Sequence, residues 1–100
     1  MNPHRPTYRL EEIKAAVAAR GVGVSTRSSL DGIRAMGLTA AEAERVIQSL
    51  TPRQFYKTMP THAANGEWQD VYHAPTPVGL AYVKFTLRRS GAIAISFKEK

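Results

Sequence analysis

Apolar positions in the first half of the chain recur at helical spacing. We expect a first helix to begin at Thr7 or Tyr8 and to end at Gly21, because apolar residues stand three or four positions apart between them. After a short extended piece, "VGVST", the run "SSLDGIRAMG" predicts a brief second helix that stops at Gly37. A third helix is predicted over "TAAEAERVIQSL", residues 39–50, where Thr39 and Glu42 have capping-box spacing and one face is apolar.

The next segment repeats the signals of a helix start. Thr51 stands where an N-cap would, Pro52 takes the first helical position, and Gln54 has the spacing to reach back to the cap. We therefore predict a short helix through "FYKTM", residues 55–59, that ends at Pro60.

Strands are predicted after this helix. The pair "NG" at residues 65 and 66 predicts a turn before the strand "EWQDVYH", and Pro75 and Pro77 are expected to separate that strand from the next. In "LAYVKFTLRRSGAIAISFK" apolar and polar residues then alternate, as in two strands that share one apolar face.

Turn chemistry fixes the register of these last two strands. A three-residue loop of Arg89, Ser90 and Gly91, with the glycine in the left-handed conformation, keeps both apolar sets on the same face. This register pairs Phe85 with Ile95 on the apolar face and Tyr82 with Lys98 on the polar face. The alternative, with Lys84 opposite Lys98, would place like charges together and is disfavoured.

These elements predict an α+β fold with N-terminal helices packed on one face of a small C-terminal antiparallel sheet. The open face would then carry Tyr82, Lys84, Ser96 and Lys98, which are cationic or hydrogen-bonding groups without a carboxylate. Two interpretations of this face remain open. Lysines on a strand surface commonly protect a sheet edge from aggregation, or the face binds an anionic ligand.

Composition and charge favour a folded protein with an anionic partner. The chain has 100 residues, 43% of them hydrophobic, which suits one domain over residues 1–100 with residues 1–6 disordered. The formal net charge of +6 attracts nucleic acid or acidic proteins, although the same charge also serves solubility. No hydrophobic stretch could act as a signal segment, so a cytoplasmic location is expected.

Several kinds of catalytic site are not supported by the sequence. The chain has no cysteine, which excludes a thiolate nucleophile, and His4, His62 and His73 are scattered rather than paired. Glu67 and Asp70 have no further acidic residue at ligand spacing, so we predict neither a metal nor another cofactor. The aromatic residues Trp68 and Tyr72 are interpreted as structural rather than as base-stacking residues.

Three short motifs resemble one known family. "FYKTM", "WQDVY" and the terminal "SFKEK" occur in the order and at the separations of the motility quorum-sensing regulator toxins, and "STRSSL" adds a weaker similarity. The resemblance extends over nearly the whole chain from about Tyr8. It implies an α+β fold similar to that of the RelE-type toxins and the activity of a metal-independent endoribonuclease, an mRNA interferase that cuts mRNA next to GC-containing triplets.

The resemblance also implies site residues and a partner. The family's catalytic positions fall, by motif, on four residues of this chain: Lys57, Gln69, Tyr82 and Lys98. Four further residues are candidates for binding single-stranded RNA: Tyr56, Lys84, Arg88 and Arg89. The implied partner is an antitoxin with a zinc-binding half and a helix-turn-helix DNA-binding half. The segments "HAPTP" and "EAERV" depart from the family pattern, and they affect base preference and the antitoxin contact rather than the chemistry.

Two other functions compete with a ribonuclease toxin. A non-catalytic RNA- or DNA-binding regulatory module would explain the charge equally well, but it has no need for Gln69, Tyr82 and Lys98 to converge. A simple transcriptional or interaction protein is the second alternative. Its DNA-binding element would be a helix-turn-helix over "SSLDGIRAMGLTAAEAERVIQ", but that segment lacks basic residues on a clear recognition face.

Overall fold

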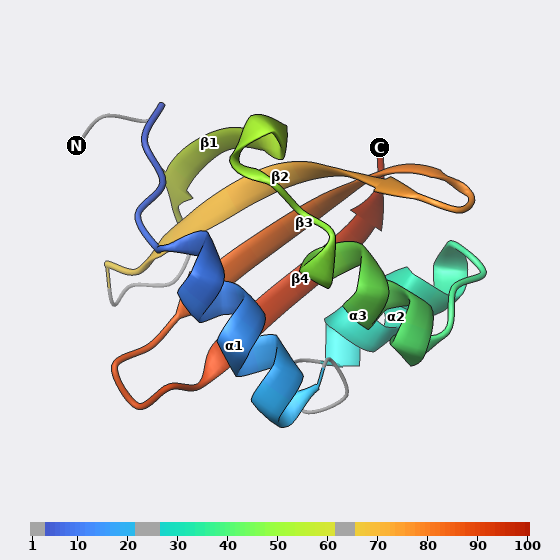
Figure 1. Ribbon diagram of the computed structural model, residues 1–100, viewed down its shortest axis with the longest axis horizontal. Coiled ribbons are helices and arrows are strands. Elements are labelled where there is room, and N and C mark those ends of the chain that lie inside the picture. The colour runs from blue at the N-terminus through green and yellow to red at the C-terminus, as the bar shows by residue number, and fades with distance from the viewer. Residues whose placement is uncertain (1–3, 22–26, 62–65) are drawn as a thin grey trace.

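The computed structural model describes residues 4–21, 27–61 and 66–100 and confirms an α+β fold with helices first and strands second (Figure 1). The helices are α1 (Leu10–Arg20), α2 (Arg27–Ala35) and α3 (Ala40–Gln48), and a 3₁₀ turn, η2 (Pro52–Gln54), follows them. The strands are β1 (Phe55–Pro60), β2 (Trp68–Thr76), β3 (Gly79–Leu87) and β4 (Ile93–Glu99). They form one antiparallel sheet in the order β1-β2-β3-β4.

The helix signals of the sequence are confirmed at α3 and corrected at α1. At α3 the Thr39 N–H donates to Glu42 Oε1 at 2.9 Å, and the Glu42 N–H donates to Thr39 Oγ1 at 3.1 Å, which is the expected capping box. Helix α1 begins at Leu10, later than predicted, because the backbone N–H groups of Thr7 and Tyr8 are held by the carboxylate of Asp70 on β2. The expected extended piece "VGVST" is residues 22–26, and all of it lies outside the described residues.

The prediction of a helix over residues 55–59 is wrong. The start signals are real, since Pro52 opens η2 and the Thr51 N–H donates to Gln54 Oε1 at 2.7 Å. The helix ends after one turn because Phe55 to Pro60 pair with β2. Tertiary pairing of an aromatic segment here outweighs local helix propensity.

A second correction concerns Pro75. Strand β2 continues through it to Thr76, so only the turn after Thr76 separates β2 from β3. Strand β1 pairs with β2 no further than Tyr72, which leaves β2 at the sheet edge on that side around Pro75. A missing backbone N–H is tolerated at such an edge.

The register of β3 and β4 agrees with the prediction. Phe85 lies opposite Ile95 and Tyr82 opposite Lys98. The hairpin closes through the Arg88 N–H, which donates to the Ala92 carbonyl at 2.8 Å. Gly91 has φ +86°, the left-handed conformation that the loop requires.

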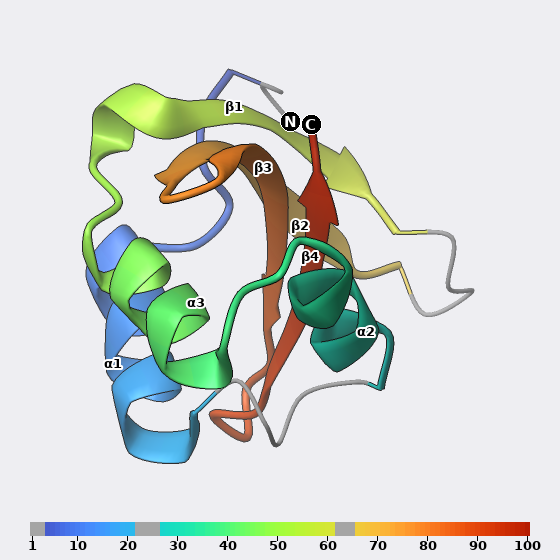
Figure 2. The same cartoon turned by 90° about the vertical axis from the view of Figure 1, so that its right-hand side faces the viewer.

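The hydrophobic core lies between the helices and one face of the sheet, and the other face carries no helix (Figures 1 and 2). The alternating residues Val83 and Phe85 of β3, and Ile95 and Phe97 of β4, are buried on the helix side. Helix α2 approaches β4 closely at Gly32, where a Cβ would stand 1.7 Å from the Phe97 carbonyl oxygen. Among the described residues, no helix has both the length and the apolarity to span a bilayer.

Candidate functional site

Two rows of side chains cross the open face of the sheet, one residue from each strand. The strand register places His73 and Lys98 on either side of Tyr82, and the ring of Tyr56 lies against His73. We call this the first row, made up of Tyr56, His73, Tyr82 and Lys98. In the second row, Val71 lies between Lys57 and Lys84, and Ser96 lies opposite Lys84.

Between and beside these rows lies a groove with a volume of about 360 Å³. Its lining residues come from all four strands and are Tyr56, Lys57, Met59, Val71, Tyr82, Lys84, Ser96 and Lys98. Three of them are lysines and none is a carboxylate. The groove is therefore a local positive region with hydroxyl groups at its wall, suited to a phosphate group.

A β-bulge in β1 gives the groove two adjacent residues. Phe55 pairs with Tyr72 and Lys57 with Val71, so Tyr56 is an extra residue between two pairs. Phe55 consequently packs its ring edge-on against Tyr72 in the core, at a centroid distance of 5.6 Å. Tyr56 and Lys57 both line the groove, which strict alternation along the strand would not allow.

Three aromatic rings of the first row are in contact. The Tyr56 and His73 centroids are 4.4 Å apart with an interplanar angle of 31°, and His73 meets Tyr82 edge-on at 5.0 Å. The ammonium of Lys57 lies 5.3 Å from the Tyr56 centroid, within cation–π range. Tyr56 is nevertheless 49% exposed, so part of its ring is open to a ligand.

Three of the four predicted catalytic residues line the groove together, namely Lys57, Tyr82 and Lys98. The fourth, Gln69 of β2, pairs with Met59 of β1 and is not among the lining residues. It is two positions from Val71 and shares its face, about 6.6 Å further along the strand. Gln69 thus borders the groove.

The candidate RNA-binding residues divide into two groups. Tyr56 and Lys84 line the groove. Arg88 and Arg89 lie at the β3–β4 hairpin, and the five-residue step from Tyr82 to Leu87 spans about 17 Å. Arg88 also contacts the Glu67 carboxylate through two nitrogens, at 2.8 and 3.2 Å, and these hydrogen bonds raise the pKa of the guanidinium. The structure does not bring either arginine into the groove.

His73 is the site residue that sequence reasoning missed. In the sequence it is one of three scattered histidines, whereas in the structure it lies between Tyr56 and Tyr82 in the middle of the aromatic row. Burial, and then the charge of Lys100, lower its pKa, so the imidazole is neutral at neutral pH. The antiparallel pairing of β2 with β3 could have revealed it, because that pairing sets His73 opposite Tyr82. Within the described ranges, no group of three or more potential metal ligands is present.

Asp70 of the "WQDVY" motif has a structural role. Its side chain is fully buried, and its two oxygens accept the backbone N–H groups of Thr7 at 2.9 Å and Tyr8 at 2.8 Å. The Tyr8 hydroxyl donates to the Trp68 carbonyl at 2.7 Å. These bonds fix the segment before α1 across β2. Tyr72 is likewise buried in the core, which confirms its structural interpretation, and burial raises its pKa to about 12.

Replacement of Asp70 by asparagine is expected to lower the free energy of unfolding by about 2–3 kcal/mol, because an amide offers an N–H₂ group to one of the two donors. Urea denaturation at neutral pH measures the change. Asp31→Asn on the exposed side of α2 is the matched control and should change the free energy by no more than about 0.5 kcal/mol. Equal effects of the two substitutions would contradict the anchoring role of Asp70.

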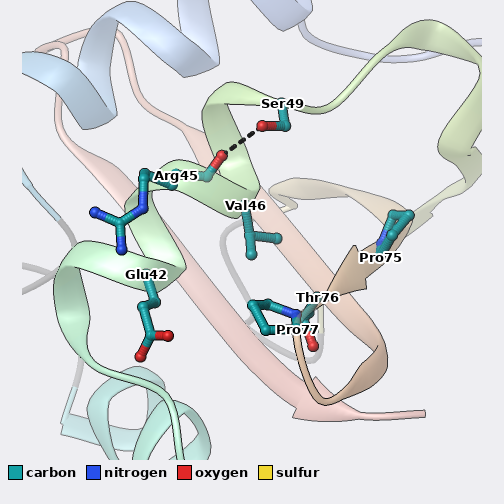
Figure 3. Close-up of a pocket in the computed structure, with 7 residues that line it drawn as sticks. All are labelled: Glu42, Arg45, Val46, Ser49, Pro75, Thr76 and Pro77. Atoms are coloured by element: carbon teal, nitrogen blue, oxygen red, sulfur yellow. Dashed lines mark hydrogen bonds between the residues drawn. The ribbon is translucent and has the colours of Figure 1, made fainter.

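A second hollow lies on the helix side, between α3 and the β2–β3 hairpin (Figure 3). Its volume is about 320 Å³. Glu42 and Arg45 contribute opposite charges to it, while Val46 and Pro77 contribute apolar surface. This hollow contains no residue that the sequence had marked as catalytic or RNA-binding.

The fold and the groove define a small α+β protein whose open sheet face carries a groove lined by three lysines and no carboxylate. The family model described as "Motility quorum-sensing regulator, toxin of MqsA" matches residues 5–99, and the chain belongs to this family. Over 100 residues it is 36% identical to the mRNA interferase toxin MqsR of Escherichia coli (strain K12), with both chains covered completely. The family membership predicted from the three motifs is confirmed.

Proposed function

We propose that the groove is the active site of an endoribonuclease that cleaves mRNA next to GC-containing triplets without a metal ion. Membership of the toxin family makes the chain the toxin of a toxin–antitoxin pair and an enzyme of the mRNA interferase type. The observation that carries the proposed site is the convergence of Lys57, Tyr82 and Lys98 in one groove whose lining includes no carboxylate.

RNA supplies its own nucleophile in this reaction. The 2′-hydroxyl loses its proton to a base and its oxygen attacks the adjacent phosphorus. The bond from phosphorus to the 5′-oxygen breaks, and an acid delivers a proton to that oxygen. The products are a 2′,3′-cyclic phosphate and a 5′-hydroxyl. The protein must therefore supply a base, an acid and positive charge for the phosphate oxygens.

The groove residues can supply each of these needs. Lys57 and Lys98 stabilise the charge that develops on the phosphate, and one of them also takes part in proton transfer. Tyr82 is the second acid or base, and Gln69 donates a hydrogen bond to phosphate or base from the border of the groove. Lys84 and Tyr56 hold the flanking RNA, the latter by stacking on a base. Arg88 and Arg89 would contact only RNA that extends to the hairpin.

The proposed partner is an antitoxin with a zinc-binding half and a helix-turn-helix half, and the proposed location is the cytoplasm, where mRNA is translated. The family's description as a toxin of MqsA supports a dedicated antitoxin. Induction of this chain without such a partner should stop growth. Continued growth of cells that contain the full-length protein would contradict a toxin role.

Cleavage of a synthetic single-stranded RNA in the presence of EDTA tests the activity. We expect cuts next to GC-containing triplets, with ends that carry a 2′,3′-cyclic phosphate. An RNA with a 2′-deoxy sugar at the cut position serves as the matched substrate, and it should bind but remain intact. Binding of the all-ribose RNA without cleavage would instead identify a non-catalytic RNA-binding module. Cleavage only after a divalent metal is restored would contradict metal independence.

A further inference from the structure

His73 occupies the centre of the aromatic row, and its chemistry is not used by the proposed reaction. Its imidazole contacts the Tyr56 ring on one side and the Tyr82 ring on the other. Its Nε2 atom is buried and has no hydrogen-bond partner among the described residues. A buried polar atom without a partner costs free energy, so its retention calls for an explanation.

The surroundings of His73 favour the neutral imidazole. The titratable or charged groups on the same face are Tyr56 and Lys57 of β1, Tyr82 and Lys84 of β3, Lys98 of β4 and Lys100 beyond β4. Four are cations, and none is a carboxylate that could pair with an imidazolium. A proton on Nε2 would therefore lie in a buried position, without an acceptor and close to like charges.

We propose that His73 is a positioning residue: its neutral imidazole holds the Tyr82 ring in place over the groove, and cleavage is lost when His73 becomes protonated. The inference deepens the proposed function and rests on it. The edge-on contact with His73 fills the space toward β2 into which the Tyr82 ring could otherwise turn. A displacement of about 1 Å of a reacting group is enough to reduce a rate strongly.

The direction of the pH effect follows from the lowered pKa of His73. The folded protein binds this proton less readily than the unfolded chain, whose histidines titrate near their ordinary value of about 6.5. The neutral, stacked state is thus fully favoured above about pH 6.5, and its advantage is lost as the pH falls toward the lowered pKa of His73. Below that pKa the imidazolium must leave the row to reach water, and Tyr82 loses its support.

The pH dependence of kcat tests the inference with two substitutions. His73→Phe keeps a ring between the two tyrosines and cannot be protonated, whereas His73→Ala removes the ring. At about pH 8 we expect kcat of the phenylalanine variant to stay within about threefold of the parent, and kcat of the alanine variant to fall about tenfold or more. As the pH falls below about 6.5, the parent should lose activity more steeply than the phenylalanine variant, because only the parent also loses the neutral His73. His4→Ala, outside the groove, should keep the parental profile.

A double substitution separates positioning from general stability. In a Tyr82→Phe background the hydroxyl that His73 positions is absent, so His73→Ala should lower kcat no further. Equal losses in both backgrounds would show that His73 only stabilises the fold and would overturn the inference. An unchanged loss of activity at acid pH in His73→Phe would overturn it as well.

NMR of the full-length protein gives a readout that does not depend on cleavage. The ring signals of Tyr82 should shift with the same midpoint as the His73 imidazole, and they should stay constant with pH in His73→Phe. If the parent cleaves no RNA at any pH but these signals shift together, the proposed function fails while the positioning by His73 holds. If the Tyr82 ring signals do not shift when His73 titrates, the inference fails, whether or not the protein cleaves RNA.

Discussion

Tyr82→Phe is expected to lower the rate of RNA cleavage by about 10²–10⁴-fold, the usual contribution of a general acid or base. The substitution removes only the hydroxyl and keeps the ring that packs against His73. The fold and RNA affinity should therefore change little. Single-turnover cleavage at saturating protein measures the chemical step, and thermal unfolding checks the fold.

The companion substitution Lys98→Met keeps most of the aliphatic stem and removes the charge. Loss of one preorganised charge next to the phosphate should lower the cleavage rate by about 10²–10³-fold. Lys14→Met on α1, on the helix side of the sheet, changes the net charge equally and should retain the parental rate. Parental rates for both Tyr82→Phe and Lys98→Met would show that the groove is not the active site.

Gly32→Ala is expected to destabilise the protein by about 3 kcal/mol, the upper part of the range for an overpacked core. The added methyl group would stand 1.7 Å from the Phe97 carbonyl oxygen, and a backbone atom held in the sheet cannot turn aside. Helix α2 must then move away from β4. Because Phe97 directly precedes Lys98, cleavage should fall together with stability.

The sign of this effect distinguishes packing from helix propensity. Propensity alone would make alanine at position 32 stabilising by up to about 1 kcal/mol. Ala15→Gly at an exposed position of α1 measures propensity without a packing change and should destabilise by about 1 kcal/mol. Urea denaturation of both variants provides the comparison. A Gly32→Ala variant as stable as the parent would show that α2 can move without cost.

Local signals in the sequence were sufficient where a single interaction decides the structure. The capping box of Thr39 and Glu42 marked α3, and the glycine at position 91 fixed the hairpin register. That register alone placed Tyr82 opposite Lys98 on the open face. The positions of Lys57 and Gln69 in the site came from the family motifs, because no periodic pattern relates β1 and β2 to the last hairpin.

Features that depend on distant segments could not be predicted from these signals. Helix η2 ends after one turn, and β1 has a bulge at Tyr56, because β1 pairs with β2. The two strands are separated in the sequence by the residues between Pro60 and Trp68. The burial of Asp70 depends on backbone N–H groups more than 60 positions away in the chain. His73 was overlooked for a related reason, since its significance comes from neighbours on two other strands.

The extra residue in β1 makes chain length, rather than residue type alone, a determinant of this enzyme. Deleting position 56 would remove the bulge and make Phe55 and Lys57 neighbours on opposite faces, so both would keep their places and the groove would lose Tyr56. Most single substitutions along β1 alter one contact at a time. One residue inserted after Lys57 would instead reverse the faces of the residues that follow it in β1, and natural variants of this toxin should accordingly tolerate replacements there far better than insertions.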